Sequence, residues 1–124
     1  MIWLGGGAAG IMGGMGKQGP KIAFIGAGSI GFTRKLVGDL MAVPELRTSE
    51  LMFMDIDSTN LERTEKLVRR DLEANALPAR MLRTTTDRRE AVRNADYVFS
   101  TVRIGGLEAF ATDVEIPLQF GVNQ

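Results

Sequence analysis

The chain of 124 residues contains no cysteine and no histidine. Without cysteine it can form neither a disulfide framework nor a thiolate site, and we expect a reducing, cytoplasmic environment. Without histidine it lacks the commonest metal ligand and the commonest general base near neutral pH. Any catalysis by this chain would therefore depend on carboxylates, lysines, the single tyrosine Tyr97 or a bound cofactor.

An excess of charge and a long apolar run are also missing. Fifteen basic and 15 acidic residues give a formal net charge of zero, so the overall charge does not favour binding to nucleic acid or to an anionic membrane. No apolar run reaches the roughly 18 residues that a membrane-spanning helix needs. The proportions of hydrophobic residues (44%) and charged residues (24%) are those of an ordinary globular domain.

Residues 1–20 are rich in glycine and methionine, and their only charged side chain is that of Lys17. Glycine interrupts every short apolar run, which is unlike a secretory signal. With few side chains to bury, the segment cannot offset the conformational entropy lost on ordering. We therefore predict a disordered leader or an added extension. A G-x-G-x-x-G match at Gly5, Gly7 and Gly10 is rejected, because neither a full strand nor a helix flanks it.

A second G-x-G-x-x-G match, at Gly26, Gly28 and Gly31, follows a continuous apolar run over residues 22–25 and precedes a helical pattern. This context is typical of a dinucleotide-binding turn. The first glycine permits the sharp turn, the second allows a pyrophosphate to approach the backbone, and the third allows the helix to pack on the sheet. The first N–H groups of the helix then face the anion.

An acidic residue occupies the position expected for contact with the adenosine ribose. The predicted strand 51–54 ends in Asp55, near the roughly 20-residue offset at which a carboxylate reaches the ribose hydroxyls. A carboxylate there would repel a 2′-phosphate, so the sequence favours NAD over NADP.

The remaining pattern alternates strands and helices, which predicts an α/β fold with a doubly wound parallel sheet of Rossmann type. We expect one NAD-binding domain over residues 21–124, incomplete, with about four strands in the order 3-2-1-4. The predicted strands are 21–25, 51–54, 81–86 and 95–102, and the predicted helices are 32–41, 58–75, 87–93 and 107–120, the last ended or kinked by Pro117.

In that order the first and fourth strands are neighbours, and ligands bind where their carboxyl ends frame a crevice. Thr101 and Arg103 should therefore lie beside the glycine turn. Arg103 could hold a pyrophosphate oxygen or a substrate group through its planar donors, or it could be a solvated side chain at a strand end. The predicted cofactor-binding residues are Gly26, Gly28, Ser29, Ile30, Gly31, Asp55 and Thr101, with Arg103 assigned to the substrate.

The Gly-Ala-Gly-Ser turn, the Met-Asp-Ile-Asp run at residues 54–57 and the Arg-Ile-Gly-Gly run at residues 103–106 together resemble the amino-terminal part of glycoside hydrolase family 4. The resemblance covers residues 21–124 in order. This family comprises NAD-dependent α-galactosidases, α-glucosidases, 6-phospho-glucosidases and α-galacturonidases, which form an exception to two-carboxylate glycoside hydrolysis.

The resemblance implies a mechanism of oxidation and elimination. Members of the family oxidise the sugar at C3 with bound NAD, remove the acidified C2 proton, stabilise the enediolate with a divalent metal, commonly manganese, and eliminate the aglycone. It also implies a glycoside as the small-molecule substrate and a homo-oligomeric full-length enzyme. The turn residues Gly26 to Gly31 match the pyrophosphate loop, Asp55 the ribose acid and Arg103 a crevice loop.

The chain departs from the family in two respects. The family's metal ligands are a cysteine and a histidine, and this chain has neither. The family's catalytic base is a tyrosine later in the sequence, whereas Tyr97 lies inside a predicted strand. We therefore assign no catalytic or metal-binding residue here, and expect the cofactor half of a longer enzyme, inactive alone. Two alternatives stay open at this point. One is a fragment of a lactate- or malate-type hydroxy-acid dehydrogenase, and the other is a non-catalytic nucleotide-binding module.

Overall fold

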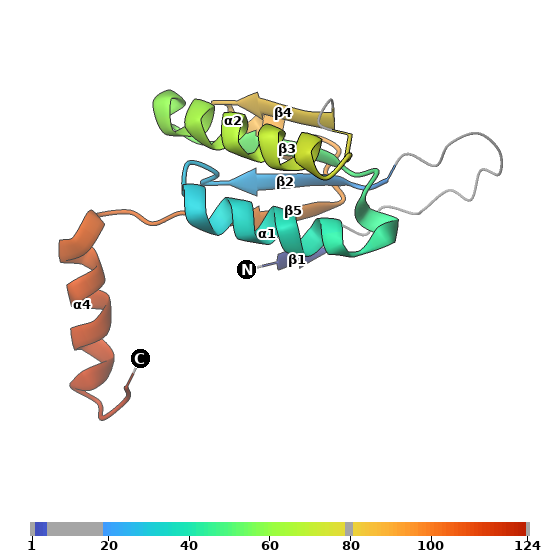
Figure 1. Ribbon diagram of the computed structural model, residues 1–124. Coiled ribbons are helices and arrows are strands. Elements are labelled where there is room, and N and C mark those ends of the chain that lie inside the picture. Colours follow the sequence, from blue (N-terminus) through green and yellow to red (C-terminus); the bar gives the residue numbers. More distant parts are fainter. Residues whose placement is uncertain (1, 5–18, 79–80, 124) are drawn as a thin grey trace.

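A computed structural model of the chain describes residues 2–4, 19–78 and 81–123. Its centre is a five-stranded sheet with the strand order β1-β5-β2-β3-β4 (Figure 1). The strands are β1 (Ile2–Leu4), β2 (Lys21–Ile25), β3 (Glu50–Met54), β4 (Leu82–Thr85) and β5 (Tyr97–Ser100). The helices are α1 (Ile30–Ala42), η1 (Pro44–Leu46), α2 (Ser58–Ala74), α3 (Arg88–Val92) and α4 (Gly106–Leu118).

The four strands from β2 to β5 are parallel to one another. Counted from β2, their order is 3-2-1-4, as predicted, and helices connect them as in a Rossmann-like fold. The predicted strand 95–102 is shorter in the structure, since only Tyr97–Ser100 pair with β2. The predicted α/β class is confirmed.

Helices α1 and α2 lie on one face of the sheet (Figure 1), and the main core lies beneath them. Phe24 of β2 is at its centre, 1% exposed, with its ring edge-on to Phe53 at 5.1 Å and stacked on Phe99 at 5.2 Å. On the other face a smaller cluster forms where Ala91 of α3 packs with Met52 and Met54. Burial on both faces explains why the central strands read as continuous apolar runs.

The start of the chain differs from the prediction. Residues 2–4, expected in a disordered leader, form strand β1, which pairs antiparallel with β5 in the register Ile2 opposite Phe99. Pairing with an existing edge strand supplies backbone hydrogen bonds that composition alone does not reveal. Residues 5–18 of the predicted leader lie outside the described part of the chain, as does the rejected glycine match.

Helix α2 begins where the sequence indicated. The carboxylate of Asp57 accepts a hydrogen bond from the backbone N–H of Asn60 at 3.0 Å, which caps the helix. Its inner residues Leu61, Val68 and Leu72 are buried in the main core. The cap therefore fixes the start of α2 directly after the carboxyl end of β3.

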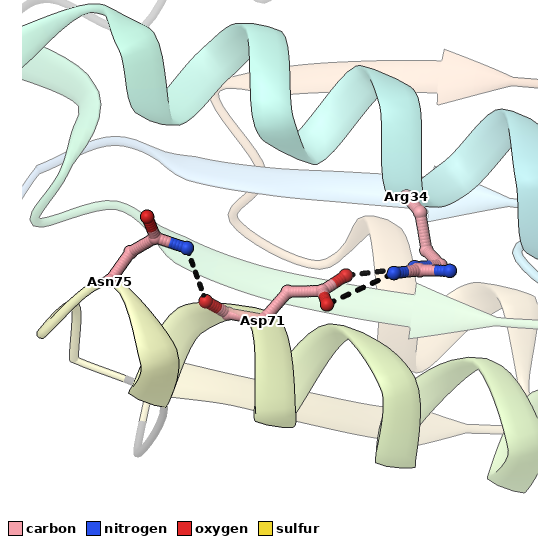
Figure 2. Close-up of polar contacts among 3 residues, drawn as sticks. All are labelled: Arg34, Asp71 and Asn75. Carbon is pink, nitrogen blue, oxygen red and sulfur yellow. Dashed lines mark hydrogen bonds and ion pairs between the residues drawn. The ribbon is translucent and has the colours of Figure 1, made fainter.

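An ion pair joins the two helices that cover the core. Figure 2 shows Arg34 of α1 reaching Asp71 of α2, with Nε to Oδ2 at 2.8 Å and a second bond to Oδ1 at 3.0 Å. The hydrogen bond and the charge of Asp71 raise the pKa of Arg34 above its ordinary value. Asn75 donates from its side chain to the backbone carbonyl of Asp71, which extends the network along α2 (Figure 2). Because both ionic side chains are well exposed, solvent screens the pair.

Helix α4 is set apart from the sheet, beyond the carboxyl ends of the strands (Figure 1). None of its residues is buried. Apolar side chains that a packed helix would cover are exposed on it, including Leu107 and Phe110. The predicted helix over 107–120 is thus present, and it ends at Leu118, one residue after Pro117. No helix among the described residues is long and apolar enough to cross a bilayer.

Replacing Phe24 by alanine should destabilise the protein by about 3–5 kcal/mol, because it removes a buried ring and leaves a cavity between Phe53 and Phe99. The matched control is Phe120→Ala, since Phe120 is 79% exposed, and we expect it to change stability by no more than about 0.5 kcal/mol. Urea unfolding followed by circular dichroism measures both variants. Equal losses in the two would contradict the assigned core.

Candidate nucleotide site

The glycine turn between β2 and α1 is attached to the end of β3 through its backbone. The N–H groups of Gly26 and Ala27 both donate to the carbonyl oxygen of Met54, each at 2.9 Å. These two bonds fasten the segment that follows β2 to the last residue of β3, before α1 begins. The predicted turn is therefore confirmed for residues 26–29, whereas Ile30 and Gly31 already belong to the first turn of α1.

The other side of the turn lies against the end of β5. Gly26 has φ of +90°, and a Cβ added to it would lie 3.0 Å from the carbonyl carbon of Thr101 and from the nitrogen of Val102. Both the left-handed conformation and the close backbone contact exclude a larger residue. The predicted proximity of Thr101 to the turn is thus confirmed.

Asp55 lies directly beside the turn, as its position in the sequence predicted. Its Oδ2 accepts the backbone N–H of Gly28 at 2.7 Å, and its Oδ1 accepts that of Asp57 at 2.9 Å. A Cβ added to Gly28 would lie 2.7 Å from Oδ2. The absence of a side chain at Gly28 therefore makes room for the carboxylate of Asp55, a role that the glycine spacing alone did not indicate.

The amide groups that remain free lie at the first turn of α1, as the sequence predicted for Ile30 and Gly31, and not at Gly26 or Gly28. Those of Gly26, Ala27 and Gly28 are engaged, as described above. The first backbone bond of α1 runs from Thr33 N–H to the Ser29 carbonyl at 2.9 Å. Within the described chain, no hydrogen bond is made by the N–H groups of residues 30–32. These three unpaired donors lie at the positive end of α1, where a helix can accept an anion.

Two further residues of the predicted turn flank the start of α1. Ser29 precedes α1 and makes no side-chain capping hydrogen bond. A Cβ added to Gly31 would meet nothing within 4 Å, so the close packing of helix on sheet that we expected there is wrong. Gly31 contributes its backbone N–H group and tolerates a side chain.

Thr101 reaches the turn through its hydroxyl group. Oγ1 lies 3.0 Å from the carbonyl oxygen of Gly26 and 3.3 Å from that of Ile25, so its one proton is within reach of both acceptors and the Gly26 oxygen is the nearer. The backbone N–H of Thr101 also donates to Ile25, at 2.8 Å. The hydroxyl and the backbone N–H of Thr101 are therefore both engaged in hydrogen bonds within the protein.

Arg103 is exposed, and its guanidinium carbon lies 4.7 Å from the ring centroid of Phe110 on α4. This is a cation–π contact at a solvated position. The structure places Arg103 two residues beyond Thr101, beside the carboxyl ends of the strands.

One candidate residue was missed by sequence reasoning. Ile56, directly after Asp55, is 89% exposed, and a large aliphatic side chain in that position next to the carboxylate offers an apolar surface to a flat ring. The available signal was an apolar residue between the two acidic residues of the Met-Asp-Ile-Asp run. No group of three or more potential metal ligands of the His, Cys, Asp or Glu type occurs among the residues that the structure describes.

With this geometry in place, comparison with known proteins identifies the family. Residues 21–124 match the model of the family described as Family 4 glycosyl hydrolase. The chain belongs to that family. The predicted resemblance is therefore confirmed, and it covers the whole glycine turn, Asp55 and the segment from Thr101 to the end of α4.

Relatives in family 4 act on several glycosides, judging by their names. The chain is 53% identical over 104 residues to an alpha-galactosidase of Rhizobium meliloti, covering 84% of this chain and 21% of that protein. It is 36% identical to an alpha-glucosidase of Erwinia rhapontici (84% and 23%) and 34% identical to a 6-phospho-beta-glucosidase of Escherichia coli (82% and 23%). The chain thus spans about a fifth to a quarter of the length of these relatives.

The glycine contacts generate a prediction about stability. Gly28→Ala should lower the free energy of unfolding by about 1–3 kcal/mol, because the new methyl group displaces Asp55 from its hydrogen bond with the turn. Gly31→Ala is the matched control, and it should be neutral or slightly stabilising, by up to about 1 kcal/mol, since alanine favours the helix. Urea unfolding compares the two; a Gly28→Ala variant as stable as Gly31→Ala would refute the crowding at Asp55.

Proposed function

We propose that residues 21–124 form the NAD-binding part of a family 4 glycosidase. The observation that carries the proposal is the direct contact between the carboxylate of Asp55 and the glycine turn, at 2.7 Å. It brings a ribose acceptor and a phosphate-binding helix end to the same point of the sheet. This combination is the requirement for a dinucleotide.

The residues present fit such a cofactor. The pyrophosphate would be held by the free N–H groups of residues 30–32 and by the dipole of α1. A carboxylate has about four lone-pair positions, and Asp55 uses one for Gly28 and one for Asp57. The others can accept the two ribose hydroxyls, while Ile56 supplies an apolar contact for the adenine.

The same carboxylate supports the choice of NAD over NADP. A 2′-phosphate would bring at least one further negative charge against Asp55, and repulsion between like charges at hydrogen-bond distance disfavours that pairing. Ile56 offers no cation to offset it. Arg34 on α1 is already paired with Asp71.

In the proposed enzyme, NAD would supply the reversible oxidation of the sugar that family 4 glycosidases use in place of two carboxylates. This chain would bind and orient the cofactor, and Arg103, beside the same edge, would contact the glycoside. We place the manganese ligands outside this chain, because it contains neither the cysteine nor the histidine that the family uses. We place the catalytic base at a later tyrosine, because Tyr97 lies within strand β5.

NAD should raise the thermal unfolding midpoint of the chain, because a ligand specific for the native state stabilises it by mass action. Asp55→Asn should weaken NAD binding about 10- to 100-fold, the effect of losing hydrogen bonds to a charged acceptor. It should also reduce the preference for NAD over NADP. Titration calorimetry with each cofactor measures both effects.

The matched control for that experiment is Asp113→Asn, which removes an exposed carboxylate from α4, away from the turn. It should leave the affinity for NAD unchanged. If NAD binding in Asp55→Asn equals that of the unaltered chain, Asp55 does not contact the ribose and the proposal fails.

The 124-residue chain alone should not hydrolyse glycosides, because the metal ligands and the base are assigned to residues outside it. The assay uses nitrophenyl α-galactoside, α-glucoside and 6-phospho-β-glucoside with NAD and Mn²⁺. Release of nitrophenol by the purified chain above that of a heat-denatured sample would contradict this assignment.

A further inference from the structure

We propose that Thr101 is a positioning residue of the nucleotide site, whose hydroxyl group holds the carbonyl of Gly26 and so sets the shape of the turn. It acts through the turn and does not itself touch the cofactor. The inference rests on the proposed NAD-binding function and assigns a role within that site. The sequence suggested a direct contact between Thr101 and the cofactor; the inferred role is indirect.

The argument begins with the backbone of Gly26. Its φ of +90° lies in a region that glycine enters freely, so the residue itself imposes little preference on the turn. Within the described chain, its carbonyl oxygen has two donors: the Thr101 hydroxyl at 3.0 Å and the Ser29 N–H at 3.4 Å. The bond from Thr101 is the shorter and comes from the segment that follows β5, so it restrains the direction of this peptide group.

The following peptide group is restrained in the same manner from the helix. Thr33 of α1 is 1% exposed, and its hydroxyl donates to the carbonyl of Ala27 at 3.0 Å. The backbone N–H groups of Gly26 and Ala27 both donate to the carbonyl oxygen of Met54. Two threonine hydroxyls and one strand carbonyl thus engage every polar group of residues 26 and 27.

The consequence is that, within the glycine turn as the structure describes it, the N–H groups of residues 30–32 are the ones left to meet a phosphate. Their direction follows from the turn that precedes them. If the turn loses the bond from Thr101, the fraction of molecules with a competent turn falls, and the apparent affinity falls by the same factor. The cofactor contacts themselves are unchanged, so the loss arises in the free protein.

The test compares Thr101→Val, which keeps the shape and removes the hydroxyl, with Thr101→Ser, which keeps the hydroxyl. Thr112→Val is the matched control, because the Thr112 hydroxyl also donates to a backbone carbonyl, that of Glu108 on the exposed helix α4. Titration calorimetry with NAD is performed well below the unfolding midpoint of each variant. Hydrogen exchange of the Gly26, Ala27 and Gly28 amides is followed without NAD.

We expect Thr101→Val to bind NAD about tenfold more weakly, which is about 1.4 kcal/mol, and to exchange the three turn amides faster. Thr101→Ser should bind within about threefold of the unaltered chain, a difference of less than about 0.7 kcal/mol. Thr112→Val should change neither measurement. A purely structural role for Thr101 would lower the unfolding midpoint without this selective effect on the turn and on NAD.

A folded Thr101→Val variant with unchanged NAD affinity and unchanged amide exchange overturns the inference. If the valine variant fails to fold, Thr101→Ala, which relieves any crowding by the second methyl group, is measured in its place. If the unaltered chain itself does not bind NAD, the proposed function fails, and exchange at Gly26 to Gly28 decides the role of Thr101 alone.

Discussion

Three hydrogen bonds at the carboxyl end of β3 hold the glycine turn in place. Met54 accepts two of them through its carbonyl, and Asp55 accepts the third through its side chain. Backbone N–H groups that are shielded from water must find partners, and here the last residue of β3 and the residue after it supply them. The turn, the start of α1 and the carboxylate are therefore a single hydrogen-bonded unit.

This unit explains why Gly26 and Gly28 of the turn are required for different reasons. Gly26 is required by its positive φ and by the approach of β5, and Gly28 by the nearness of Asp55. Gly31 faces open space, so no steric requirement for glycine applies at that position. A motif with three glycines thus contains two steric requirements of different origin, one backbone against backbone and one backbone against carboxylate.

Much of this arrangement could be predicted from the sequence. The apolar run before Gly26, the offset to Asp55 and the alternation of strands and helices predicted the parallel order of β2 to β5, because each signal is local or has a fixed spacing. The Gly28–Asp55 contact and the hydroxyl bonds of Thr33 and Thr101 could not be predicted. They depend on side-chain positions across different elements, for which a single sequence has no local signal.

The edge of β5 has a further consequence. Its outer hydrogen-bonding groups are taken by the antiparallel strand β1, whereas in a doubly wound sheet the next parallel strand would occupy that position. Strand β1 and a further parallel strand cannot both form hydrogen bonds with the same edge of β5. Any polypeptide that pairs directly with β5, whether from the same chain or from another molecule, must first displace residues 2–4, so β1 covers this edge of β5.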